Sequence, residues 1–168
     1  MGGIATAIKD KHYLNVLKVC EGNRVEFNIV CLGQSQPAIN VINMYGSQES
    51  ILNIDDVNEE WEELLTEIVK IEAKEELLIL VNDANCHIGN EITKENHPKI
   101  TQRGKLLLDL IGRNEYKLVN ALDITAGGPF TRYDTSDPQN KDQMSLVDYV
   151  VVSSKLVNHV KKFEIDSQ

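Results

Sequence analysis

Two polar side chains that follow an apolar run are the first candidates for chemistry. Residues 77–81 read Leu-Leu-Ile-Leu-Val, and Asp83 and Asn85 come directly after them. Because side chains alternate along a strand, both would point to one side of a sheet at its rim, where α/β proteins place reactive groups. A carboxylate there can orient or deprotonate water, and a neutral amide can hold a phosphate oxygen without repelling it. A purely structural alternative is an Asx turn that ends the strand.

A third carboxylate interrupts another apolar run. Asp148 lies within residues 146–152, which are otherwise apolar, and a buried carboxylate costs free energy unless it is hydrogen-bonded or paired. Asp148 is therefore either a functional acid or a structural aspartate bonded to Ser145 or to a backbone amide. Tyr45 ends a further apolar stretch and precedes Gly46. Taken alone, it is an ordinary aromatic residue at a strand end.

Short apolar runs separated by turn residues predict the strands that must position these side chains. In the first 45 residues, the strands are expected at 3–8, 13–19, 25–31 and 38–45. Their short polar connections favour an antiparallel meander. Further strands are expected at 77–81, 117–120, 130–133 and 146–152.

Two helices complete the expected set of elements. In the acidic segment, Asp56 and Glu59 have the spacing of a capping box. The apolar residues that follow fall on one helical stripe, namely Trp61, Leu64, Leu65, Ile68 and Ile71. A second helix is expected at 102–114, with Leu106, Leu107, Leu110 and Ile111 facing inward. This order of elements predicts a mixed α/β sandwich with sheets inside and helices outside.

Composition and charge exclude several classes of protein. The chain has 168 residues, which suits one domain, and no apolar run approaches the roughly 20 residues that span a bilayer. Its three cysteines, Cys20, Cys31 and Cys86, form no C-x-x-C pair, so we expect neither a zinc ribbon nor a disulfide framework. This use of cysteine predicts an intracellular, reducing compartment. Residues 49–76 contain eleven acidic and two basic residues and alone account for the net charge of −9. No basic patch that would bind DNA by charge alone is present.

The combination of these features resembles the endonuclease/exonuclease/phosphatase superfamily, and is most similar to the endonuclease domains of non-LTR retrotransposons. Residues 39–46 resemble the family strand with the active-site tyrosine. Residues 81–85 resemble its Gly-Asp-x-Asn motif, with Asn82 in the glycine position. Residues 146–153 resemble its Ser-x-x-Asp strand, with Ser145 and Asp148 as the motif residues. The intervening similarity includes Cys86-His87-Ile88-Gly89, Arg103-Gly104, Leu118-Val119-Asn120 and Gly128-Pro129-Phe130-Thr131.

The resemblance implies a four-layer α/β sandwich of two mainly antiparallel sheets with outer helices, and divalent-metal-dependent hydrolysis of phosphodiester bonds. By position, Asp83 would position or activate water, Asn85 would hold a phosphate oxygen, and Tyr45 would stabilise the transition state. Asp148 would orient a catalytic histidine, and Thr131 would line the substrate cleft. Mg²⁺ or Mn²⁺ is the implied cofactor, and DNA the implied partner.

The chain departs from the family pattern at both ends. It has no counterpart of the family's early Asn and metal-binding Glu, nor of its final Ser-Asp-His, and His159 follows Asp148 too closely to serve. Residues 1–168 are therefore expected to form a partial domain, incomplete at both ends and inactive alone, with an incomplete metal site. A reverse transcriptase domain in the same polypeptide and a cytoplasmic or nuclear location would accompany this interpretation. The alternatives are a non-catalytic retroelement remnant or binding module, and a phosphatase or lipid phosphodiesterase of the same superfamily.

Overall fold

The large sheet is mixed and has six strands. The computed structural model describes residues 4–7, 9, 16–21, 26–33, 37–48, 52–90, 92, 99–128, 131 and 145–165. Across the sheet the strands lie in the order β1 (Val16–Glu21), β2 (Glu26–Leu32), β3 (Ile39–Tyr45), β4 (Leu77–Asp83), β7 (Asp148–Ser153) and β5 (Tyr116–Leu118). Only the β3–β4 pair is parallel, so the sheet is mainly antiparallel and the meander predicted for its first strands is confirmed for β1 to β3.

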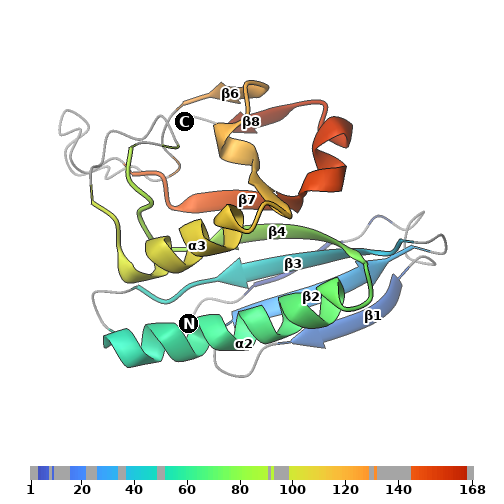
Figure 1. The fold of residues 1–168 in the computed structure, drawn as a ribbon, viewed down its shortest axis with the longest axis horizontal. Coiled ribbons are helices and arrows are strands. Elements are labelled where there is room, and N and C mark those ends of the chain that lie inside the picture. The colour runs from blue at the N-terminus through green and yellow to red at the C-terminus, as the bar shows by residue number, and fades with distance from the viewer. Residues whose placement is uncertain are drawn as a thin grey trace.

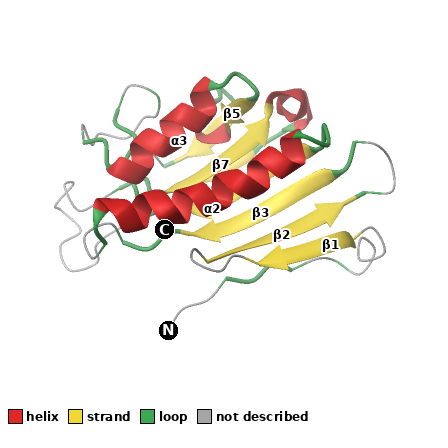
Figure 2. Ribbon diagram, turned by 60° about the horizontal axis from the view of Figure 1, so that its bottom comes forward, coloured by secondary structure: helices red, strands yellow, loops and turns green. Residues whose placement is uncertain are grey.

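Both α-helices of the described residues cover the same face of this sheet (Figures 1 and 2). The helix α2 (Ile54–Glu72) forms the crossover between β3 and β4, as a parallel pair requires. Its apolar stripe is buried as predicted, with Trp61, Leu64, Ile68 and Ile71 facing inward. The predicted capping box was placed wrongly, because Asn53 is the N-cap and exchanges hydrogen bonds with Asp56. The helix α3 (Gln102–Gly112) packs beside α2 and buries Leu107 and Leu110.

A small parallel sheet was not predicted. It pairs β6 (Thr125–Gly127) with β8 (Phe163–Ile165) and lies beyond β7, at the end of the molecule away from β1 (Figure 1). The two 3₁₀ helices η1 (Val119–Ala121) and η3 (Ser154–His159) lie in the chain before β6 and β8 respectively. None of the described helices is long and apolar enough to cross a membrane.

Two predicted strands differ because side chains take over backbone hydrogen bonds. Of the strand predicted at 3–8, the structure describes residues 4–7, which belong to no strand, and the Asn43 amide nitrogen donates to the Ala5 carbonyl at 3.1 Å. The strand predicted at 117–120 ends at Leu118. Beyond it, the Asn120 amide oxygen accepts from the Val150 N–H at 2.8 Å, and its nitrogen donates to the Asp148 carbonyl at 3.1 Å. Of the strand predicted at 130–133, the described residues include only Thr131, which lies in a bend.

The two faces of the sheet differ in exposure. Residues that point toward the helices are fully buried, among them Ile42, Met44, Leu78, Leu80 and Val151. On the opposite face, which we call the open face, Tyr45 is 37% exposed and Val81 is 41% exposed. Polar side chains on the open face can therefore reach solvent and a ligand.

Two asparagines are buried under the helices in neighbouring strands. Asn40 in β3 donates from its side-chain nitrogen to Glu76 Oε2 at 2.9 Å. Asn82 in β4 is 2% exposed, and neither polar atom of its side chain has a hydrogen-bond partner among the described residues. An unsatisfied buried amide lowers stability, whereas a satisfied one does not.

We expect Asn82→Leu to raise the free energy of unfolding by about 1–3 kcal/mol, because it removes the unsatisfied amide and keeps a side chain of similar shape. Urea denaturation followed by circular dichroism measures the change. Asn40→Leu is the matched control and should lower stability, because the Glu76 carboxylate loses a donor. An equal loss in both variants would show that Asn82 has a partner after all.

Candidate active site

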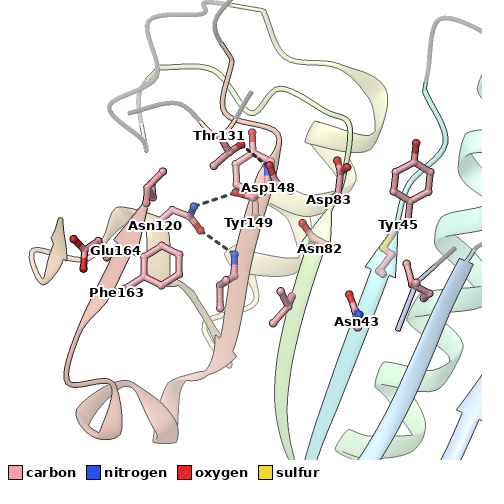
Figure 3. A pocket seen from close by; sticks show the side chains of 15 residues that line it. Asn43, Tyr45, Asn82, Asp83, Asn120, Thr131, Asp148, Tyr149, Phe163 and Glu164 are labelled. Atoms are coloured by element: carbon pink, nitrogen blue, oxygen red, sulfur yellow. Dashed lines mark hydrogen bonds between the residues drawn. The ribbon is translucent and has the colours of Figure 1, made fainter. Parts of the chain in front are cut away.

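Three candidate residues from three strands lie side by side on the open face. Tyr45 ends β3 and is paired with Asp83, which ends β4, and Asp83 is paired with Asp148, which begins β7. Paired residues on neighbouring strands project from the same side of a sheet, with Cβ atoms about 5 Å apart. Tyr45, Asp83 and Asp148 therefore form one continuous row, which we call the cross-strand row (Figure 3).

The cross-strand row lies in a cavity of about 380 Å³. Thr131 and Asn120 line the cavity next to Asp148, and Val150, Phe163 and Ile165 contribute apolar surface. The described lining residues include three carboxylates, Asp83, Asp148 and Glu164, but no lysine, arginine or histidine. An anion can therefore enter this cavity favourably only when a cation accompanies it.

The backbone of Asp148 is held by two side chains, Thr131 and Asn120. Its N–H donates to the Thr131 hydroxyl at 3.2 Å, and the Val147 N–H donates to the same oxygen at 3.1 Å. Its carbonyl accepts from the Asn120 amide. Burial raises the pKa of the Asp148 carboxyl above its ordinary value, and a hydrogen bond with the Thr131 side chain opposes the rise.

Asn85 does not line the cavity with the others. The strand ends at Asp83, and Asn85 has a φ of 46°, a left-handed conformation that asparagine tolerates better than most residues. Its side-chain nitrogen donates to the Gly46 carbonyl at 2.7 Å. The strand thus ends two residues before Asn85, and the Asn85 N–H donates to Asp83 Oδ1 at 3.3 Å, which is the bond of an Asx turn. Thr131, by contrast, lines the cavity as the resemblance implied.

Arg103 lies behind the cross-strand row and was not singled out by its chemistry in the sequence. Its side chain is fully buried and pairs with Glu60, at 2.8 Å between Nη2 and Oε2. The signal was present, because Arg103 lies four and seven residues before the buried Leu107 and Leu110 of α3. That spacing places a charged residue on the apolar stripe of a helix.

The comparisons with known proteins find similarity in structure alone. No protein-family model and no curated protein matches the sequence. Among solved structures, a 3′-5′ exonuclease from Neisseria meningitidis has a TM-score of 0.55 with 19% identity over 81% of this chain and 55% of that protein. The endonuclease domain of TRAS1, a telomere-specific non-LTR retrotransposon, has a TM-score of 0.51 with 17% identity over 79% and 52%. An endonuclease/exonuclease/phosphatase from Bacteroides vulgatus has a TM-score of 0.51 with 10% identity over 77% and 44%.

The chain has the endonuclease/exonuclease/phosphatase fold. The fold class predicted from the sequence is thereby confirmed, with a second sheet and helices beside the large sheet. The chain spans about half the length of these solved structures.

The described residues of this endonuclease/exonuclease/phosphatase fold hold no group of three or more His, Cys, Asp or Glu side chains suited to a metal ion. The cross-strand row does present two neighbouring carboxylates, Asp83 and Asp148. Mg²⁺ commonly binds proteins through one or two carboxylates and keeps water and phosphate as its other ligands. The donors present thus fit a loosely held Mg²⁺ and do not fit a metal enclosed by protein.

The raised pKa of Asp148 gives a pH dependence of stability. Because the folded protein binds this proton more tightly than the unfolded chain, Asp148 favours folding below its ordinary pKa of 3.8, and this contribution is lost as the pH rises through the raised pKa. We expect Asp148→Asn to raise the free energy of unfolding at about pH 7, and the gain to disappear at about pH 3.5. Urea denaturation at both pH values measures it.

Asp109→Asn, a substitution in α3 outside the cavity, is the control for removing one acidic charge. A gain of equal size in the two variants would mean that net charge, and not burial of Asp148, causes the effect.

Proposed function

We propose that the cavity is a site of divalent-metal-dependent phosphodiester hydrolysis in nucleic acid. The observation that carries the proposal is the cross-strand row, which gathers a tyrosine and two carboxylates from distant parts of the sequence in a chain of this fold. Two of the solved structures similar in fold are named as nucleases. The low identities mean that this likeness supports the fold, and the row supports the chemistry.

Each residue receives a role that its position permits. Asp83, at the centre of the row, orients the attacking water and accepts its proton. The Tyr45 hydroxyl, at the exposed end, donates to a phosphate oxygen as negative charge develops there. Asn85 lies outside the described cavity lining and donates from its side chain to Gly46, so its proposed contact to a second phosphate oxygen requires a substrate that extends beyond the cavity. Thr131 lines the cleft and accepts a hydrogen bond from the Asp148 N–H. The Asp148 carboxylate is proposed either to orient a catalytic histidine or to hold the metal ion together with Asp83.

Charge in the cavity favours a phosphodiester over a phosphate monoester. The described lining residues include Asp83 and Asp148 and no basic side chain, whereas Glu164 is paired with Lys162. Negative charge at the two aspartates repels a dianionic monoester more strongly than a monoanionic diester. Asp83 and Asp148 would hold the Mg²⁺ or Mn²⁺. The bound ion would neutralise charge on the phosphate. This charge distribution argues against the phosphatase alternative.

The proposal extends to partners and setting. The proposed substrate is DNA, and a reverse transcriptase domain in the same polypeptide and a cytoplasmic or nuclear location fit a retroelement endonuclease. The 168 residues alone are proposed to be inactive, since no imidazole or basic group is among the described lining residues. The same observation favours a second candidate, a non-catalytic binding module on this scaffold.

We expect paramagnetic Mn²⁺ to broaden the amide NMR signals of Asp83, Ala84 and Asp148, because these amides lie beside the two carboxylates. Asp83→Asn and Asp148→Asn should each weaken the effect at least tenfold, and Asp109→Asn should leave it unchanged. A dinucleoside monophosphate added with Mg²⁺ should shift the same signals more than a nucleoside monophosphate does. Broadening centred on the glutamates of α2 would contradict the site, and preference for the monoester would restore the phosphatase alternative.

Plasmid nicking in Mg²⁺ tests the proposed inactivity of the 168-residue chain. We expect the 168-residue chain to nick no faster than its Asp83→Ala variant. Nicking that is lost in Asp83→Ala would establish an active nuclease and overturn the proposed inactivity. If Mn²⁺ and the dinucleotide bind at the row and the chain does not nick, both the inactive nuclease domain and the binding module use this one binding site.

A further inference from the structure

The guanidinium of Arg103 joins the ends of two strands of the cross-strand row. Its Nη1 atom donates to the Ser47 carbonyl at 2.7 Å and to the Ala84 carbonyl at 2.9 Å. Ser47 lies two residues beyond Tyr45, and Ala84 follows Asp83 directly. The two N–H groups of one nitrogen therefore bridge the turns that follow β3 and β4.

The bridge is tightly packed and is reinforced by the backbone. The Gly46 N–H donates to the Asp83 carbonyl at 2.8 Å. A Cβ atom on Gly46 would lie 2.8 Å from the Ala84 carbonyl oxygen and 3.0 Å from Arg103 Nη1, closer than atoms tolerate. Tyr45 and Asp83 therefore cannot move apart without breaking contacts to the same guanidinium.

We infer that Arg103 is a positioning residue that sets the mutual position of Tyr45, Asp83 and Asn85. Its catalytic meaning depends on the function proposed above, whereas its geometric role does not. A buried ion pair such as Arg103–Glu60 is weak evidence for stability, because desolvation offsets the attraction of the charges. The planar guanidinium holds its N–H donors in fixed directions, which a lysine ammonium does not. Glu60, on α2, compensates the charge of Arg103 and fixes the plane of its guanidinium.

The test distinguishes the effect of Arg103 on the position of the strand ends from its effect on overall stability. It removes the ion pair by substitutions that still fill the buried space. The double variant Glu60→Met/Arg103→Met replaces both charges with apolar side chains of similar length, and Arg103→Lys keeps the charge without the planar fork. Amide hydrogen exchange is measured at Gly46 and Ala84, whose N–H groups bond to Asp83 and Val147. Tyr116→Phe is the control, because it breaks a buried hydrogen bond to Glu72 near the opposite end of β4.

We expect protection at Gly46 and Ala84 to fall at least tenfold in both Arg103 variants, with protection in the middle of β4 unchanged. Tyr116→Phe should leave Gly46 and Ala84 at their wild-type rates. Unchanged protection at these two amides in either folded variant would overturn the inference, as would full protection restored by lysine. Arg103→Lys keeps the test decisive if the double variant fails to fold.

A second measurement connects the geometry to the proposed site. Mn²⁺ broadening at Asp83 should weaken severalfold in Arg103→Lys and not in Tyr116→Phe. Unchanged broadening in Arg103→Lys would show that the row does not depend on Arg103. Absence of Mn²⁺ broadening in the wild-type protein would count against the proposed function alone, because the exchange rates at Gly46 and Ala84 would still report the role of Arg103.

Discussion

One buried arginine determines how the two parallel strands of the sheet end. Arg103 bonds the carbonyls of Ser47 and Ala84, and Glu60 balances its charge from the helix that links the two strands. Because β3 and β4 are parallel, their carboxyl ends meet at one edge of the sheet, and antiparallel β7 begins at the same edge. The crossover helix, the second helix and the cross-strand row therefore depend on a single set of contacts. The directions of β3, β4 and β7 bring the residues of the row to one edge, and Arg103 fixes the spacing between the ends of β3 and β4 from the helix-covered face.

This arrangement concentrates energetic cost around the row. Arg103 is a charge buried under the sheet, Asp148 is a carboxylate whose pKa burial raises, and Asn82 is an unsatisfied amide next to Asp83. The remaining strands bury apolar side chains under α2 and α3 and can offset this cost. Polar groups that reduce stability usually persist where function needs them. The roles proposed for Arg103 and Asp148 would explain their cost, and Asn82 has no such explanation in the contacts of the described residues.

Sequence reasoning succeeded where a pattern is local and failed where a partner is distant. The stripe of α2 and the apolar runs of β3, β4 and β7 are local signals. Tyr45 and Asp83 were candidates because they lie where such runs end, and Asp148 because it interrupts one. The β6–β8 pairing, the amide of Asn120 on β7 and the bond from the Asn85 side chain to Gly46 depend on segments far away in the chain. Arg103 is the intermediate case. Its place on an apolar stripe was visible, but its acceptors belong to two other elements.

The position of the acidic helix changes what the net charge says about nucleic acid. The residues that set the charge of −9 lie mostly on α2, which covers the face of the sheet opposite the cross-strand row (Figure 2). The sheet therefore separates this helix from anything bound on the open face. A ligand there meets the three carboxylates of the cavity and the apolar surface of Val150, Phe163 and Ile165. Binding of a phosphodiester must then depend on an accompanying cation and on apolar contact, so overall acidity neither excludes nor explains it.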